Sequence, residues 1–241
     1  MVCCNLAAAV SVNDWVRMKK VLILIPVVMV AAGGFWLYTS FFAPTQEASG
    51  PITAAPLANA PAGLRKFQVN AEKSIARFTV SEILRGQPKT VVGSTRQVAG
   101  EVGVNLADLS TMQVGEIQVN ARTLKTDDDM RNRMVGNQIL STTQYEFIKF
   151  IPTQVTGLTG SGSAGAKLPF SIAGNLTVRQ ITKPVTFNAT LEIISPSELK
   201  VTATAKVKRA DYALTIPSVP SVANVGEEVQ LDIEGVAIAA Q

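Results

Sequence analysis

Residues 127–129 are three consecutive aspartates, and carboxylates are the ligands that Ca²⁺ prefers. A calcium loop, however, places its oxygen ligands at alternate positions and ends on a distal glutamate, and this segment lacks that spacing. Acidic residues that precede Met130 and Met134 at helical spacing are instead typical of a first helical turn, which they cap. We therefore expect a helix over about residues 127–140 and no metal site.

A second segment with possible chemistry is the glycine-rich stretch 160–167. A phosphate-binding loop requires Gly-Lys-Ser/Thr followed by a helix, whereas this chain has Gly165-Ala166-Lys167-Leu168 and no helical pattern after it. The stretch predicts a flexible hairpin loop rather than a nucleotide site.

Histidine is absent, and the only cysteines are Cys3 and Cys4. The missing histidine excludes Ser-His-Asp and Cys-His catalysis and removes the commonest metal ligand. Both cysteines precede a long apolar run, so no disulfide or thiolate metal site can form after it. They are either acylated near a membrane or part of a poorly ordered tail. No nucleophile elbow or carboxylate pair stands out, and we expect neither an enzyme nor a bound cofactor.

The chain has 241 residues, of which 47% are apolar and only 17% charged, with a net charge of +4. Charges of both signs are interspersed, without a basic stripe carrying aromatic residues. Nucleic acid is therefore not expected as a partner.

Residues 21–43 contain no charged side chain and are long enough to cross a bilayer as a helix. Arg17, Lys19 and Lys20 precede them, which predicts a cytoplasmic tail over residues 1–20 and an extracytoplasmic domain after the span. The expected location is a bacterial cell membrane, with the domain in the periplasm or on the cell surface. A cleaved signal peptide is the alternative, but its apolar core would be shorter. Met1 and Met18 both remain open as the start.

Residues 44–65 are rich in proline, alanine and glycine and have no periodic apolar face. They predict a semi-extended linker that holds the following domain, residues 66–241, off the membrane.

The domain is dominated by short segments in which apolar and polar residues alternate, separated by turn residues. In residues 170–187 the pattern predicts two strands joined at positions 179–184, with Pro184 opening the second. Further alternating segments follow the same rule, so we expect an all-β fold, an antiparallel barrel of about eight strands with one short helix. Many inward positions are small, which favours a cavity but is also compatible with tight sheet closure.

Four segments in series resemble the YceI-like domain family. Residues 174–187 read G-x-L-T-x-x-x-x-T-K-P-V-x-F, and residues 74–86 read S-x-A-x-F-x-V-x-E-x-L-x-G. The helical segment after Thr126 contributes D-x-R-N-x-x-V, and residues 209–231 contribute R-x-D-Y, I-P-S-V-P-x-V and V-G-E-E-V-x-L. One departure is visible, since many relatives have Tyr-Pro where this chain has Tyr145-Glu146.

The resemblance implies a lipocalin-like extended β-barrel that carries an isoprenoid or quinone-like lipid and has no general enzymatic role. The predicted function is therefore that of a membrane-anchored lipid-binding protein. The alternative is a barrel filled by its own side chains that acts as a ligand-free envelope interaction or stress-response module. A homodimer is left open.

We predict seven apolar residues to line the lipid cavity: Phe78, Val80, Leu176, Val178, Phe187, Leu191 and Val201. On the helix, Met130 and Met134 are candidates for an adaptable lid or for ordinary core packing. Arg131 and Arg133 are candidates for head-group contacts or for solvated surface charges. The Ile216–Pro217 segment could close one end of the barrel or serve as a rigid connector.

Overall fold

The computed structural model describes residues 34–35, 38, 43–53, 55–57, 63–219 and 221–240. The chain divides into two compact units, Met1–Ala43 and Pro44–Gln241. The predicted tail lies wholly, and the predicted span almost wholly, outside the described residues. Within the part that is described, no helix is both long and apolar enough to cross a membrane.

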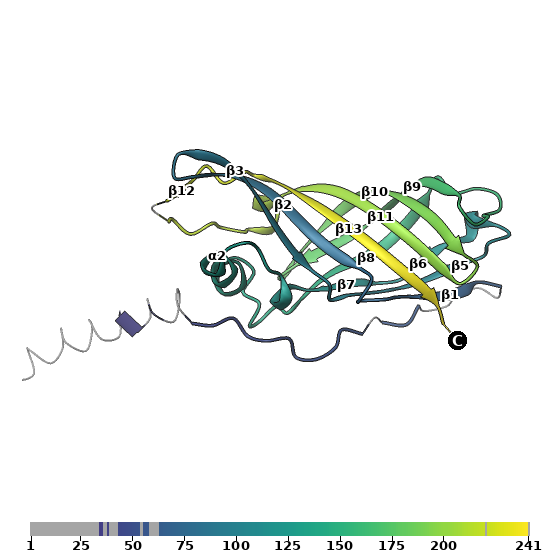
Figure 1. Ribbon diagram of the computed structural model, residues 1–241, viewed down its shortest axis with the longest axis horizontal. Helices are drawn as coiled ribbons and strands as arrows, with labels where there is room; N and C mark the ends of the chain where they lie inside the picture. The colour runs from purple at the N-terminus through teal and green to yellow at the C-terminus, as the bar shows by residue number, and fades with distance from the viewer. Residues whose placement is uncertain are drawn as a thin grey trace, which may run out of the picture. The chain divides into compact units, whose positions relative to one another are not determined.

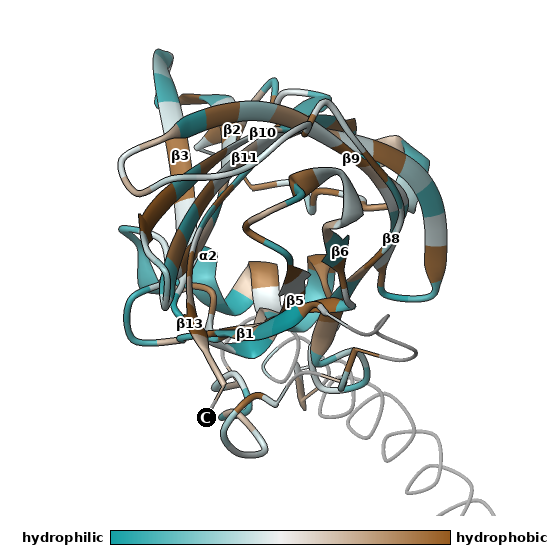
Figure 2. Ribbon diagram, turned by 90° about the vertical axis from the view of Figure 1, so that its right-hand side faces the viewer, coloured by the Kyte–Doolittle hydropathy of each residue, from teal (hydrophilic) through white to brown (hydrophobic). Residues whose placement is uncertain are grey.

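The second unit is an antiparallel sheet that curls around its own apolar face (Figures 1 and 2). An all-β fold with one short helix, as the alternation predicts, is confirmed. The strands are β1 (Arg65–Val69), β2 (Ile75–Leu84), β3 (Gln87–Thr95), β4 (Val98–Ala99), β5 (Glu101–Val104), β6 (Gln113–Val114), β7 (Ile117–Asn120), β8 (Phe147–Thr156), β9 (Lys167–Val178), β10 (Ile181–Ser195), β11 (Glu198–Lys208), β12 (Val222–Ala223) and β13 (Glu228–Ala239).

The main path through the sheet runs β4-β7-β8-β9-β10-β11-β13-β1-β5-β6, and β2 branches from β13 to pair with β3 and β12. The curl follows from the two ends of this path. β4 pairs with β7 and β5 pairs with β1, yet β4 and β5 are separated in the chain by Gly100 alone. The sheet therefore bends until both of its ends lie against one short segment.

Alternation determines which side chains face inward. On β10, Phe187, Ala189, Leu191 and Ile193 are buried, whereas the residues between them are more exposed. Neighbouring strands keep the same phase, since Phe187 pairs with Ile172 of β9, which is also buried. One face of each strand thus joins a continuous apolar interior, and the other face meets solvent.

The connection between β9 and β10 is shorter than predicted. Ile181 pairs directly with Val178, so the turn comprises Arg179 and Gln180 rather than residues 179–184. Arg179 has a left-handed backbone with φ of 57°. Pro184 is tolerated inside β10 because β11 pairs with β10 only from Asn188 onward.

The predicted helix is present as two consecutive pieces, α2 (Asp129–Met134) and the π-helical turn η3 (Val135–Ile139). Asp128 is the N-cap, and its side chain accepts a hydrogen bond of 2.8 Å from the backbone N–H of Arg131. The acidic run therefore starts the helix, as expected. Three 3₁₀ turns complete the fold: η1 (Leu109–Thr111), η2 (Ala121–Thr123) and η4 (Arg209–Tyr212).

The interior is fully packed in the half that contains β1 and β5. Phe67, Val104, Leu109 and Leu191 have no exposed surface there. Further toward the middle, the rings of Phe150 and Phe187 meet edge to face, with centroids 5.0 Å apart. Gly174 on β9 makes room for this contact, because a Cβ at that position would lie 2.6 Å from both the Phe150 ring and the Ile151 carbonyl oxygen.

Gly174→Ala should therefore destabilise the domain by about 1–3 kcal/mol through overpacking. Gly235→Ala, in the interior of β13, is the matched control, since a Cβ there meets nothing within 4 Å. We expect it to be neutral or slightly stabilising, by up to about 1 kcal/mol. Urea unfolding of both variants measures the difference, and equal losses would contradict the role assigned to Gly174.

Candidate functional site

The half of the interior beyond the Phe150–Phe187 contact holds a cavity of about 580 Å³. It reaches the surface at the end of the unit that carries α2 and the β2–β3 hairpin (Figure 1). This volume lies within the range of small-molecule sites, about 300–1,000 Å³. Inward positions of six strands form the deep wall: Phe78, Val80, Val91, Ile148, Leu176, Val178, Val207, Val229 and Leu231, supplemented by Leu124.

The rim of the cavity, here called the mouth, is formed by short elements and loops. α2 and η3 contribute Met130, Met134, Val135 and Ile139. The β2–β3 hairpin contributes Leu84, Arg85 and Lys89, and the segment between η4 and β13 contributes Leu214, Ile216, Pro217, Val219, Ser221, Val222 and Val225. A mostly apolar wall with its polar groups gathered at one opening suits a ligand with a long apolar body.

Four of the seven predicted lining residues lie on the cavity wall: Phe78, Val80, Leu176 and Val178. Phe187 and Leu191 are buried in the packed half instead, and Val201 is partly buried against that same core. The two groups differ in how far along the strands they lie from the mouth. Alternation identifies the inward face of a strand, but it does not reveal how far along the strand the side chains stop filling the interior.

Of the helix candidates, Met130, Arg131 and Met134 lie at the mouth, whereas Arg133 is not among the lining residues. Met130 is 51% exposed and Met134 is buried, so the two methionines cover the mouth from outside and inside respectively. The Ile216–Pro217 segment, for which the sequence leaves both an end closure and a rigid connector open, also lies at the mouth. Leu124 and Val207 also line the cavity but were not singled out, because each belongs to a short turn or a strand end without its own signal. Tyr212 was noted in the R-x-D-Y segment but not assigned to the cavity, which it also lines.

Arg131 organises the charges at the mouth. Its guanidinium contacts Glu82 Oε1 at 2.8 Å and Asp127 Oδ1 at 2.5 Å. Lys89 Nζ lies 2.7 Å from the other oxygen of Asp127. The hydrogen bond from Lys89, followed by the charges of Lys89 and Arg131, holds the pKa of Asp127 below its usual value despite partial desolvation. Each of these two cations is thus held by a carboxylate.

The carboxylates of the acidic run that were considered for Ca²⁺ have other partners. The carboxylate of Asp127 pairs with the side chains of Lys89 and Arg131, and that of Asp128 caps α2, so neither is free to bind a metal ion. Among the described residues, no group of three or more aspartate, glutamate, cysteine or histidine side chains converges on one point.

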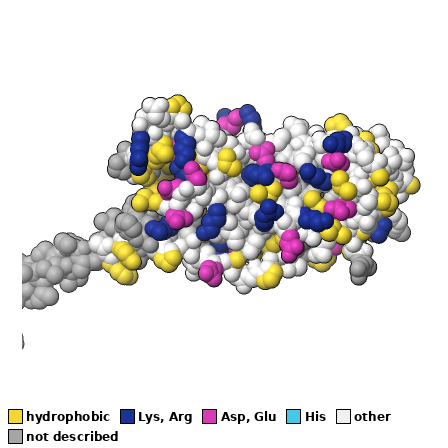
Figure 3. Space-filling model, in the orientation of Figure 1, with side chains coloured by type: hydrophobic (Ala, Val, Ile, Leu, Met, Phe, Trp, Pro, Cys, Tyr) yellow, Lys and Arg dark blue, Asp and Glu magenta, His cyan; other side chains and the backbone are white. Residues whose placement is uncertain are grey.

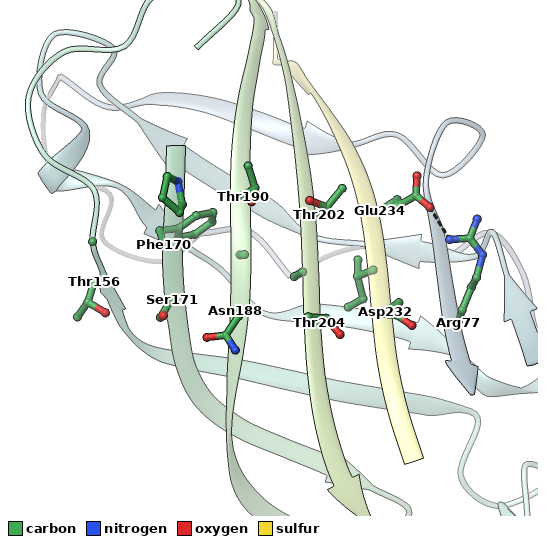
Figure 4. A pocket seen from close by; sticks show the side chains of 15 residues that line it. Arg77, Thr156, Phe170, Ser171, Asn188, Thr190, Thr202, Thr204, Asp232 and Glu234 are labelled. Carbon is green, nitrogen blue, oxygen red and sulfur yellow. Dashed lines mark hydrogen bonds and ion pairs between the residues drawn. The ribbon is translucent and has the colours of Figure 1, made fainter. Parts of the chain in front are cut away.

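A second hollow, of about 810 Å³, lies on the outer face of the sheet (Figure 4). It is larger than the interior cavity, but its exposed side chains are short and polar. One row crosses six strands in register: Thr156, Ser171, Asn188, Thr204, Asp232 and Arg77. Arg77 is also paired with Glu234. Because this surface is open and polar, it offers an apolar ligand little gain, and the interior cavity is the better candidate.

The YceI-like domain model matches residues 67–237, which is most of the chain. The chain belongs to the YceI-like domain family. The match spans every strand of the curled sheet except the ends of β1 and β13, so the family pattern and the cavity belong to the same unit.

Solved structures of the YceI-like fold are similar in shape although distant in sequence. A polyisoprenoid binding domain from Saccharophagus degradans, implicated in plant cell wall breakdown, has 15% identity and a TM-score of 0.56, over 73% of this chain and 99% of that one. Burkholderia cenocepacia BcnA has 17% identity and a TM-score of 0.54, over 70% and 98%. At this identity the likeness establishes the fold alone. No curated protein sequence matches the chain.

The buried pair at the mouth gives a prediction about stability. Arg131→Ala would leave Glu82, whose side chain is 6% exposed, without its cation, and should cost about 3–5 kcal/mol. Arg133→Ala removes a neighbouring cation that has no ion pair within the described part of the chain, and should change stability by less than about 0.5 kcal/mol. Chemical unfolding of the two variants measures the difference, and similar losses of stability would contradict the role assigned to the Arg131–Glu82 pair.

The burial of Tyr212 predicts that the free energy of unfolding falls at alkaline pH. The side chain is 1% exposed, and its hydroxyl has no hydrogen-bond partner among the residues that the structure describes. Burial, with the nearby charge of Asp211, raises its pKa from 10.0 to about 12. Because the folded-state pKa is the higher one, this stability is fully present below pH 10 and is lost as the pH rises through about 12.

The loss should amount to about 2–3 kcal/mol, since each pKa unit corresponds to about 1.4 kcal/mol. Tyr212→Phe should remove this part of the pH dependence and leave stability at neutral pH unchanged or slightly higher. Urea unfolding of both proteins across that interval provides the measurement. Parallel pH profiles would contradict the prediction.

Proposed function

We propose that this protein is a membrane-anchored lipid carrier that holds an isoprenoid-type chain inside its curled sheet. The observation that supports the proposal most directly is the mostly apolar cavity of about 580 Å³, whose mouth lies between α2, the β2–β3 hairpin and the segment before β13. We further propose that the sheet, whose ends meet at Gly100, acts as a closed lipocalin-like barrel of about eight strands.

The energetics favour a long apolar chain. Moving a methylene group from water into an apolar site gains about 0.8 kcal/mol, so a chain of many such groups needs few polar contacts to bind. The deep wall offers aliphatic and aromatic side chains, and polar groups gather at the mouth. A lipid would therefore lie with its chain inside and its polar end at the mouth.

One of the solved structures with this fold supports the same class of ligand. The Saccharophagus degradans structure with the same fold is described as a polyisoprenoid binding domain. An isoprenoid or quinone-like lipid is accordingly the ligand that we propose here, and the protein would act by binding rather than by catalysis.

The location is inferred from the apolar run. Residues 21–43 would anchor the protein, and Arg17, Lys19 and Lys20 would keep its N-terminus in the cytoplasm. The lipid-binding domain would then face the periplasm or the cell surface of a bacterium, next to the bilayer that supplies its ligand.

A cavity-filling variant tests the proposal. Val80 lines the cavity, and on the neighbouring strand Val92 faces outward with 45% of its surface exposed. Val80→Trp should occupy the cavity and abolish lipid retention, whereas Val92→Trp should retain the lipid. Solvent extraction of the purified full-length proteins, followed by mass spectrometry, quantifies long-chain isoprenoids for each mole of protein.

The matched substitution corrects for bilayer lipid that accompanies the anchor, because both variants keep residues 21–43. Circular dichroism checks that both are folded. Equal isoprenoid content in the two variants, or none in the parent protein, would refute the lipid-carrier function and favour a ligand-free interaction module.

A further inference from the structure

The residues that follow the apolar run are bound to the outside of the sheet. This segment, residues 44–53 and 55–57, is here called the strap. It belongs to the same compact unit as the sheet and runs along it from the mouth end to the opposite end (Figure 1). Its contacts form three groups, one at each end and one in the middle.

The strap begins beside the mouth. Thr45 packs against Gly136 in η3, where a Cβ would lie 2.7 Å from Thr45 Cγ2. The neighbours of Gly136 on the same turn, Val135 and Ile139, line the cavity. A glycine at position 136 thus lets the chain reach the sheet unit at the rim of the mouth.

A half-buried polar cluster holds the middle of the strap. The backbone N–H of Ser49 donates to Glu146 Oε1 at 2.9 Å, and the carbonyl of Glu47 accepts from Arg122 at 3.3 Å. Glu146 and Arg122 form an ion pair of 2.9 Å, and their side chains are about one-tenth exposed. Burial raises the pKa of Glu146, but the hydrogen bonds from Ser49 and Asn120 and the charge of Arg122 outweigh it, so the pKa is lowered.

The far end of the strap lies over two further glycines. Leu57 packs on Gly103 and Gly115, where added Cβ atoms would lie 2.9 Å and 3.4 Å from its methyl groups. Its backbone N–H also donates to the Glu101 carboxylate. The strap, which has no apolar pattern of its own, is therefore held at three glycines and two carboxylates of the sheet unit, namely Gly103, Gly115, Gly136, Glu101 and Glu146.

Docking of the strap removes the spacer between the apolar run and the domain. If free, the 22 residues 44–65 could extend over about 70–80 Å, at 3.3–3.6 Å for each residue. In the structure, Thr45 is already docked, two positions after Ala43, where the apolar run ends. The chain therefore enters the sheet unit at the mouth and with almost no slack.

We propose that the strap fixes the mouth of the cavity against the lipid bilayer that holds residues 21–43. This inference rests on the anchor and the lipid cavity of the proposed function. It adds the orientation of the domain and the surface that meets the membrane. That surface is the mouth, with exposed Met130 and half-buried Leu84 and Val219, and hydrophobic side chains gather between basic ones at this end in Figure 3. A lipid would then pass between bilayer and cavity without crossing water.

Two single-cysteine variants of the full-length chain test the orientation, with Cys3 and Cys4 replaced by serine. Gln87→Cys places a fluorescent label at the β2–β3 hairpin beside the mouth, and Ser161→Cys places it in the exposed β8–β9 loop at the opposite end. The proteins are reconstituted into phosphatidylethanolamine and phosphatidylglycerol vesicles that contain spin-labelled acyl chains. We expect severalfold stronger quenching at position 87 than at position 161.

A spacer variant tests the part played by the strap. A 12-residue Gly/Ser insertion between Ala43 and Pro44 adds a root-mean-square length of about 20 Å and leaves the strap and sheet intact. Quenching at position 87 should fall toward that at position 161. Unchanged quenching would show that the strap does not set the distance and would overturn its role.

The outcomes separate this inference from the proposed function. Equal quenching at the two positions, with isoprenoid still retained by the protein, would overturn the orientation and leave the carrier function standing. Strong quenching at position 87 without any retained isoprenoid would support the orientation and refute the carrier function. Quenching at neither position would refute the anchored arrangement and the orientation together.

Discussion

The edge-to-face contact between Phe150 and Phe187 divides the inside of the curled sheet into two halves of different character. On one side, side chains such as Leu191 and Ile193 fill the interior and supply the cohesion that a folded domain needs. On the other side, the same strands continue with inward apolar residues that do not meet one another. The contact exists because Gly174 has no side chain beneath the Phe150 ring. One missing Cβ therefore helps to set where the packed core ends and where the cavity starts.

The alternating pattern was sufficient to predict the faces of β9, β10 and β11, because each has a run of inward apolar residues long enough to show period two. It was not sufficient for β3. Gln87-Pro88 resembles a turn, and Gly93 interrupts the alternation. Gly93 is explained only by the fold, since a Cβ there would lie 2.2 Å from the Phe78 ring on the neighbouring strand. A strand whose residues are chosen to fit the side chains of its partner strand leaves little signal in its own alternation.

The cavity residues, too, could be predicted only in part from the local sequence. Phe78, Val80, Leu176 and Val178 could be found from periodicity together with the family resemblance. What separates them from Phe187 and Leu191 is their position along the interior of the curled sheet, and that position depends on the packing of all strands at once.

The strap is another feature that the local sequence does not reveal. Residues 44–57 have the composition of a free linker, and what binds them lies far away at Gly103, Gly136 and Glu146. Glu146 is also the position at which this chain departs from the Tyr-Pro of many relatives.

Charge pairing at the mouth determines which of its cations could meet the polar end of a ligand. Arg131 lies between the carboxylates of Glu82 and Asp127, and Lys89 shares Asp127, so these two cations face three negative oxygens that already neutralise them. A phosphate group would have to displace a carboxylate that is partly buried with its cation, and the desolvation cost of breaking such a pair offsets much of the attraction. A neutral polar group can accept a hydrogen bond from the rim without breaking any pair. Under the proposed function, the polar end of the lipid would therefore meet neutral groups of the rim or Arg85, which lines the mouth without an ion pair among the described residues, while the apolar chain supplies the binding free energy.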